Sequence, residues 1–290
     1  AANPCWDNYE LIASARCGAE FHQFKCFENG KFNIPDLEAK MKDDAQKYGS
    51  VRVILNFPQN PSGYSPTVNE AKEICRVVKD IAESGNKVLV LSDDAYFGLN
   101  YEDDIEPQSL FAYLADIHEN VLAIKADGPT KEDFAWGFRT GFITFASKGM
   151  TSAQYAALET KFMAAIRSSV SCSSTPSQSL VMHAINEPCH EEQKKQLRKM
   201  LKRRYDLVRA FVNSHESSVL EPLPFNSGYF MSFNVKTGNA EQIRRKLLET
   251  TGIGIIQIDQ NTLRVAFSSI DEDKIDSVYE SIYKVAQSLE

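Results

Sequence analysis

Near-continuous apolar runs that alternate with helical stretches are the feature that most constrains the fold of this chain. SVRVILNF (50–57), KVLVLSDD (87–94) and VLAIKADG (121–128) are strand-like runs, and amphipathic stretches at 34–49 and 67–84 precede the first two of these runs. Strands of this kind are typical of parallel sheets whose crossover helices cover the faces. We therefore predict an α/β fold with a mostly parallel sheet flanked by helices.

Two further runs, FHQFKCF (21–27) and GFITFAS (141–147), are also strand candidates. In open α/β sheets, ligands bind beyond the carboxyl ends of the strands. The polar residues that follow each apolar run are therefore the first candidates for a functional site.

The carboxyl-terminal part of the chain has a different character. A long helical region runs through HEEQKKQLRKMLKRRYDLVRAFVNSH, and short strand-like and helical segments follow it. At 290 residues the chain is also long for a single core. We predict a large domain over 1–188, a connecting helix over 189–215 and a small α+β domain over 216–290.

The charge balance argues against some classes of partner. The net charge is −7, which argues against nucleic acid or an anionic membrane as the main partner. No apolar run reaches the roughly 18 residues of a membrane span, and the first ten residues lack the basic and apolar regions of a signal peptide. The basic run 194–204 has the spacing of a solvated helix face.

Six scattered cysteines are typical of reduced thiols, so we expect a cytoplasmic protein.

Polar residues follow three of the runs. Asn60 lies in a Pro- and Gly-containing turn, Asp93 and Asp94 end a strand with Tyr96 close behind, and Lys131 follows a Gly-Pro-Thr turn. Each has a simple structural explanation when it is taken alone: turn chemistry for Asn60, a helix cap for Asp93, and a solvent-facing side chain for Lys131.

Taken together, the motifs resemble those of fold-type-I pyridoxal-phosphate enzymes, specifically class I/II aminotransferases. NPCWDNY, NPSG, SDDAYFG, TKEDFAWGFR and TLRVAF occur in that family's order and at about its spacings, over nearly the whole chain. The resemblance implies pyridoxal 5′-phosphate as the cofactor, transfer of an amino group from an amino acid to a 2-oxo acid, and a homodimer.

The resemblance also implies the roles of the strand-end residues. Lys131 would form the Schiff base with the cofactor, and burial beside other cations lowers a lysine's pKa. Asp93 would hold the proton on the pyridine nitrogen. Tyr96 and Asn60 would bind the ring hydroxyl oxygen. Asp94 is the alternative to Asp93, but adjacent strand residues face opposite ways, and the spacing to Tyr96 favours Asp93.

The remaining motifs imply further ligands. Arg139 would bind the phosphate, which suits a planar guanidinium. Trp6 would stack on the ring, and Tyr9 would support the pyridine-binding aspartate. Arg264, in the small domain, would clamp the substrate α-carboxylate through two hydrogen bonds.

The sequence departs from the family near the lysine. Gly128 stands where the family often has a phosphate-binding serine, and it supplies no hydroxyl. Thr130 is the candidate to serve the phosphate instead. Asp127 would repel a phosphate, so we expect its side chain to point elsewhere.

The family's glycine-rich phosphate loop would precede the tryptophan motif, and it is not present. The GxG in TGIGII (251–256) leads into a strand and is interpreted as a turn. We expect this chain to be the carboxyl-terminal two-thirds of a longer one, and these residues alone to hold the cofactor weakly.

Two other functions remain open at this point. A β-lyase or decarboxylase would use the same cofactor and fold. A non-catalytic effector-binding domain of a regulator would need a DNA-binding module upstream. These motifs do not identify the side chain of the substrate. Arg167 lies near the position where dicarboxylate-specific members of the family carry a second arginine, but a solvated arginine at a helix end is the favoured interpretation.

Overall fold

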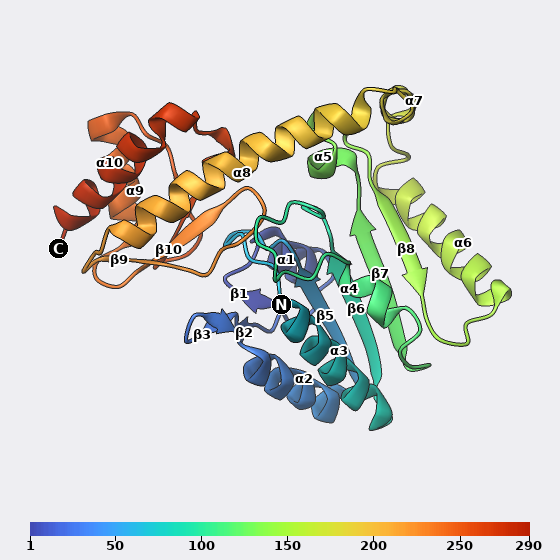
Figure 1. Cartoon of the computed structure of the whole chain (residues 1–290). Coiled ribbons are helices and arrows are strands. Elements are labelled where there is room, and N and C mark those ends of the chain that lie inside the picture. Colours follow the sequence, from blue (N-terminus) through green and yellow to red (C-terminus); the bar gives the residue numbers. More distant parts are fainter.

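Two four-stranded sheets lie toward opposite ends of one long helix in the computed structural model, which describes residues 1–290 (Figure 1). The larger sheet has the order β5-β6-β7-β8. Its strands are β5 (Ser50–Asn56), β6 (Lys87–Asp93), β7 (Val121–Asp127) and β8 (Phe142–Ala146). The first three are parallel, and β8 is antiparallel to β7. The prediction of a mostly parallel sheet is confirmed.

Three helices cover one face of this sheet: α2 (Ile34–Tyr48), α3 (Val68–Glu83) and α4 (Leu110–Leu114). The strand side chains beneath them are buried and apolar, and they include Val51, Val53, Val88, Val90, Val121 and Ala123. Side chains that point to the opposite face, such as Ile54, Leu89 and Leu122, are only half-buried. The sheet is therefore fully covered on one face and partly covered on the other.

Local signals in the sequence fix the ends of the two long covering helices. The side chain of Asn33 accepts a hydrogen bond from the amide of Asp36 at the start of α2, and Gly49 ends that helix with φ 65°. At the start of α3, Thr67 and Glu70 form a reciprocal capping box. These ends lie within a residue of those predicted from the sequence.

The predicted strand over 21–27 is wrong as a single element. The structure has two short strands there, β2 (Phe24–Lys25) and β3 (Phe27–Glu28). β2 pairs with β1 (Ala2–Asn3), and β3 folds back on β4 (Lys31–Phe32). Asn29 and Gly30 both have positive φ, which makes the tight hairpin that a straight strand could not contain. A short α1 (Asn8–Glu10) continues into a π-helical segment, Leu11–Arg16.

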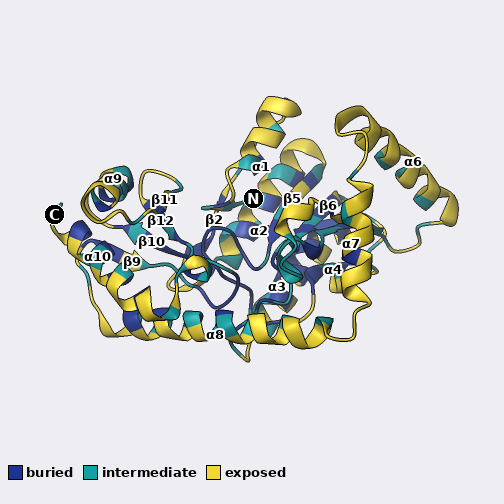
Figure 2. Cartoon of the chain, turned by 90° about the horizontal axis from the view of Figure 1, so that it is seen from above, coloured by how far each residue is buried: buried dark blue, intermediate teal, exposed yellow.

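The second half of the larger sheet leads into the long helix. After β7 come α5 (Pro129–Glu132), a 3₁₀ turn (Trp136–Phe138) and β8. Then follow α6 (Ser152–Ser169), α7 (Thr175–Ile185) and α8 (His190–Ser214). Figure 1 shows α8 running from above α5 to the smaller sheet, and Figure 2 shows α6 and α7 largely exposed.

The smaller sheet has the order β11-β12-β10-β9 and is antiparallel. Its strands are β9 (Leu220–Pro222), β10 (Met231–Val235), β11 (Ile256–Gln257) and β12 (Thr262–Val265). Two helices, α9 (Ala240–Thr251) and α10 (Ile275–Gln287), pack with it around a second core that contains Phe233 and Tyr279. Short 3₁₀ turns, Phe267–Ser269 and Glu272–Lys274, precede α10. None of the helices combines the length and the apolar character needed to cross a lipid bilayer.

Candidate active site

The carboxyl ends of the parallel strands lie level with one another. Asn56, Asp93 and Ala126 occupy corresponding positions in β5, β6 and β7. Asn56 Nδ2 donates to the carbonyl of Asp93 (2.9 Å), and Asn56 Oδ1 accepts from the amide of Asn60 (2.8 Å). The Asn60 turn is therefore fixed directly beside the strand end that carries Asp93.

Asp93 has a defined orientation at this edge. Its Oδ2 accepts a hydrogen bond from the hydroxyl of Tyr9, and its Oδ1 accepts from the amide of Ala95 at 3.1 Å. Tyr9 is buried, and burial together with the neighbouring Asp93 charge raises the pKa of its phenol, so the hydroxyl stays a donor. The Trp6 ring stands edge-on to Tyr9, with centroids 5.4 Å apart.

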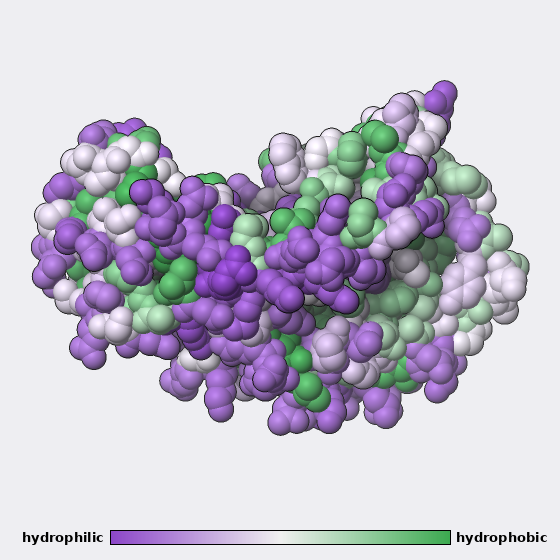
Figure 3. All heavy atoms as spheres, turned by 45° about the horizontal axis from the view of Figure 1, so that its top comes forward, coloured by the Kyte–Doolittle hydropathy of each residue, from purple (hydrophilic) through white to green (hydrophobic).

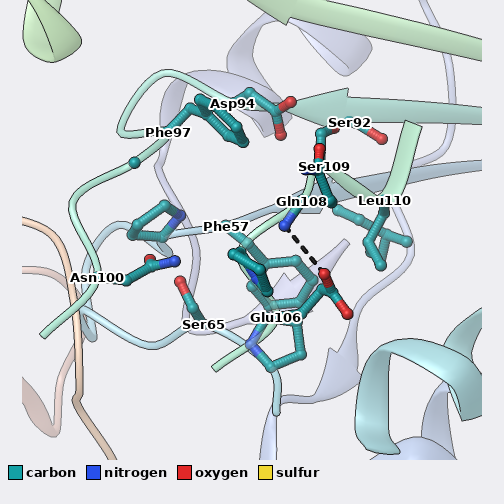
Figure 4. A pocket seen from close by; sticks show the side chains of 15 residues that line it. Phe57, Ser65, Ser92, Asp94, Phe97, Asn100, Glu106, Gln108, Ser109 and Leu110 are labelled. Atoms are coloured by element: carbon teal, nitrogen blue, oxygen red, sulfur yellow. Dashed lines mark hydrogen bonds between the residues drawn. The ribbon is translucent and has the colours of Figure 1, made fainter. Parts of the chain in front are cut away.

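Asp94 faces away from this edge, into a separate cavity of about 20 Å³ (Figure 4). Its side chain is 5% exposed, and Oδ2 has no hydrogen-bond partner. Ser92 Oγ and Asn100 Oδ1, which line the same cavity, are buried without partners as well. Burial raises the pKa of the Asp94 carboxyl to about 7, while a hydrogen bond from Ser109 and the charge of Lys125 oppose the rise.

Asp94 should therefore destabilise the folded chain as the pH rises. Its folded pKa lies above the unfolded value, so its contribution is most favourable below about pH 4 and is lost as the pH rises toward 7. We expect Asp94→Asn to unfold with a free energy about 2–4 kcal/mol higher than the original chain above pH 7, and with little difference at pH 4. Urea unfolding at several pH values measures this.

Asp103→Asn is the matched control, because Asp103 is an exposed aspartate near by in the sequence. Its difference curve against the original chain should be flat between pH 4 and 8. A flat curve for Asp94→Asn too would show that the Asp94 carboxyl is not perturbed by its burial.

Lys131 lies in α5, whose start requires a glycine. A Cβ on Gly128 would stand 2.8 Å from the Cα of Gly141 and 2.9 Å from the carbonyl oxygen of Thr140. The close approach of these two backbone segments explains why the hydroxyl-bearing residue expected from the family is absent. Asp127 pairs with Lys125, so its carboxylate has a partner within β7 itself.

The amine of Lys131 is half-buried beside an aromatic ring. Its Nζ lies 5.2 Å from the centroid of the Tyr96 ring. Burial lowers the pKa of Lys131, the positive charge of Arg139 lowers it further, and Asp93 opposes both. Burial raises the pKa of Tyr96 to about 12, so the phenol is neutral beside the amine.

Two residues were assigned to the phosphate from the sequence, and both make local contacts with the backbone. Arg139 is exposed, has φ 55°, and donates from Nη1 to the carbonyl of Trp136 at 3.1 Å. Thr130 Oγ1 donates to the carbonyl of Thr140 over 3.5 Å, a long hydrogen bond. The Thr130 hydroxyl is thus turned toward the backbone before β8.

Arg264 reaches from β12 to the Asn60 turn of the larger sheet. Its Nη1 donates to Asn60 Oδ1 at 2.8 Å, and its guanidinium carbon lies 4.3 Å from the centroid of the Phe230 ring. Its Nε is buried without a partner, and burial lowers the pKa of the guanidinium. A guanidinium with donors left over is suited to bind a carboxylate.

The sequence reasoning missed the aromatic pair Tyr229 and Phe230. Both rings pack edge-on against Tyr96, at 5.4 and 5.6 Å between centroids. Gly63 makes room for them: it has φ 77°, and a Cβ there would lie 1.9 Å from the Phe230 carbonyl oxygen. The signal in the sequence is an aromatic pair that directly follows the turn FNSG.

Comparison with known proteins agrees with this architecture. The family described as "Aminotransferase class I and II" matches residues 1–282. A probable N-acetyl-LL-diaminopimelate aminotransferase of Bacillus subtilis (strain 168) is 27% identical over 87% of this chain and 57% of its own length. A kynurenine–oxoglutarate transaminase of Dictyostelium discoideum is 25% identical over 81% of this chain and 48% of its own length.

Solved structures show the same fold. An aminotransferase from Anaerococcus prevotii superimposes with a TM-score of 0.86 at 23% identity, over 98% of this chain and 68% of the other. A kynurenine aminotransferase from Pyrococcus horikoshii gives a TM-score of 0.77 at 19% identity, over 99% and 68%. The chain spans about half the length of the two curated relatives described above. It belongs to the class I and II aminotransferase family.

Proposed function

We propose that the protein is a pyridoxal-phosphate-dependent aminotransferase, which moves an amino group from an amino acid to a 2-oxo acid. The observation that carries this proposal is the grouping of charged side chains around Tyr96. The Lys131 amine lies beside its ring. Arg264 reaches the same strand ends through its hydrogen bond to Asn60, whose turn is bonded to Asn56 beside Asp93. An amine, a carboxylate and a guanidinium from three different elements thus meet at one edge of the sheet.

The residues present fit the cofactor. An unpartnered guanidinium nitrogen, an oriented carboxylate and a half-buried lysine of lowered pKa are the groups that such a site needs. Lys131 would attach the cofactor, Asp93 would hold its ring nitrogen, and Asn60 and Tyr96 would hold its ring oxygen. Trp6 would cover the ring, with Tyr9 supporting Asp93. Arg139 and Thr130 would serve the phosphate. When bound, pyridoxal phosphate supplies an electron-withdrawing ring that stabilises negative charge on the substrate α-carbon.

The chain's own groups would then do two things to the amino acid. Arg264 would bind the α-carboxylate and orient the α-carbon. Lys131, with its pKa lowered by burial, would move a proton between the substrate α-carbon and the C4′ carbon of the cofactor. General acid–base catalysis of this kind contributes roughly 10²–10⁴-fold.

Product analysis tests the reaction class. The complete protein, loaded with pyridoxal phosphate, is incubated with a panel of amino acids and with 2-oxoglutarate as acceptor. An aminotransferase forms a new 2-oxo acid and glutamate in equal amounts. Pyruvate with ammonia would indicate the β-lyase, and an amine with carbon dioxide would indicate the decarboxylase. The absence of turnover with every amino acid of the panel would indicate the effector-binding domain.

Arg264→Lys tests the carboxylate clamp. The lysine keeps the charge but loses the two-pronged geometry. We expect kcat/KM for amino acids to fall by at least about tenfold, which corresponds to about 1.4 kcal/mol of transition-state binding. Cofactor absorbance should hardly change, because Arg264 is assigned to the substrate.

Arg203→Lys is the control, since Arg203 is an exposed arginine of α8 that pairs with Glu272. It should leave kcat/KM unchanged within about twofold. An Arg264→Lys variant with full efficiency toward every amino acid tested would show that the carboxylate is held elsewhere.

We further propose a homodimer in a reducing compartment. Large apolar side chains are exposed on the outer helices, among them Met163, Ile166, Leu180 and Met182. Apolar surface gathers on the half of the molecule that carries the larger sheet (Figure 3). Contiguous exposed apolar surface is typical of association sites, and six free cysteines fit a cytoplasm.

A further inference from the structure

The backbone of the reactive lysine is held by a side chain from the segment that leads into β10 of the smaller sheet. The hydroxyl of Tyr229, which directly precedes Phe230 and β10, donates to the carbonyl oxygen of Lys131 at 3.1 Å. The same oxygen accepts from the amide of Phe134 at 3.3 Å. Burial raises the pKa of Tyr229, so its hydroxyl keeps its proton and remains a donor.

The Tyr229 ring also contacts the neighbours of this lysine. It stacks on Phe134, with planes 22° apart and centroids separated by 6.5 Å. Phe134 has φ 55°, a conformation that a bulky residue rarely adopts without support. The ring is also edge-on to Tyr96, whose ring in turn lies beside the Lys131 amine. One side chain thus contacts the lysine's carbonyl, the strained residue after α5, and the ring that the amine faces.

A second set of contacts fixes the carboxyl end of α5. Lys194 of α8 pairs with Glu132 at 3.0 Å and with Asp133 at 2.8 Å, and His190 lies 3.2 Å from Asp133. These ion pairs hold the side chains that follow Lys131. Among the side-chain hydrogen bonds of the structure, the Tyr229 bond is the one made to the backbone of Lys131 itself.

We propose that Tyr229 is a positioning residue for Lys131, an inference that rests on the proposed function. Its hydroxyl and ring hold the α5 turn so that the amine stays half-buried against Tyr96, where its pKa is lowered. The adjacent Phe230 packs on Arg264, so this dipeptide joins the carboxylate-binding guanidinium to the reactive amine. Tyr229 itself touches no reacting atom.

The test removes one hydroxyl. Tyr229→Phe keeps the ring contacts with Phe134 and Tyr96 but loses the hydrogen bond to Lys131. The matched control is Tyr101→Phe, because the hydroxyl of Tyr101, like that of Tyr229, donates to a backbone carbonyl oxygen, that of Gly228 at 2.6 Å. Both variants lose a phenol-to-carbonyl bond, and only one loses it at the lysine.

The first measurement needs no cofactor and no turnover. Cofactor-free protein is labelled with acetic anhydride over a range of pH, and the modification of Lys131 is followed by peptide mass spectrometry. In Tyr229→Phe the freed amine becomes more exposed, so the midpoint of the labelling curve should move to higher pH, by about half a unit or more. Tyr101→Phe should keep the original midpoint. An unmoved midpoint in Tyr229→Phe, or an equal shift in both variants, would overturn the proposal.

The second measurement uses the complete, cofactor-loaded enzyme. We expect Tyr229→Phe to lower kcat by about fivefold or more while KM for the amino donor stays within about twofold, because the lysine moves and the carboxylate clamp does not. A change confined to KM would contradict the assignment. The labelling result stands whatever the reaction proves to be, so failure of the positioning role and failure of the proposed function are distinguishable.

Discussion

Asp93→Ala is expected to abolish transamination while the chain stays folded. The cofactor's ring nitrogen would lose the carboxylate that keeps it protonated, and the ring would then stabilise negative charge at the α-carbon poorly. We expect kcat/KM to fall by about 10³-fold or more. Tyr9 would also lose the acceptor for its hydroxyl, but Asp93 is only half-buried, so the sheet should keep its core. Steady-state kinetics and circular dichroism of the purified variant measure the two effects.

Asp94→Ala is the matched comparison, because the two aspartates are adjacent and differ mainly in the side of the sheet that they face. Asp94 lines a cavity of its own (Figure 4), and neither Tyr9 nor Asp93 belongs to the lining of that cavity. Its loss should alter stability more than kcat/KM. A reversed order, with Asp94→Ala inactive and Asp93→Ala active, would show that Asp94 is the pyridine ligand.

Lys131→Ala is expected to lose turnover by about 10⁴-fold or more, since both the attachment of the cofactor and the proton transfer at the α-carbon depend on the amine. Lys148→Ala serves as the control, because Lys148 is exposed in the loop after β8. Single-turnover conversion of a bound amino acid to its 2-oxo acid, followed at the cofactor absorbance, separates this step from product release. Comparable rates in Lys131→Ala and Lys148→Ala would show that the reaction does not depend on Lys131.

The strand ends were predictable because three apolar runs determine both the sheet and the edge where it ends. VLVLSDD indicates a buried strand that stops at a carboxylate. Strand alternation predicts that Asp93 and Asp94 face opposite ways, and the spacing to Tyr96 favours Asp93 for the site. The structure shows that separation: one carboxylate accepts from Tyr9 and the other faces a cavity. The ends of α2 and α3 were predictable for a similar reason, since Asn33, Gly49 and the Thr67–Glu70 box act within a few residues.

Contacts across long sequence separations were not predictable. Tyr229 meets Lys131 across 98 residues, and Arg264 meets Asn60 across 204, so no local pattern announces either pair. The sequence alone did not explain the glycine at position 128. A side chain there is excluded by the close approach of Gly141, which directly precedes β8. The break between β2 and β3 was missed because FHQFKCF has the pattern of a single strand. The turn at Asn29 and Gly30, beyond that run, lets β3 pair with β4 as a hairpin.

Borohydride reduction tests whether Lys131 carries the cofactor. The complete protein is loaded with pyridoxal phosphate, reduced, digested and mapped by mass spectrometry. We expect a phosphopyridoxyl group on Lys131 Nζ, in the peptide that contains TKEDFAWGFR. A label on another lysine, or on none, would contradict this expectation.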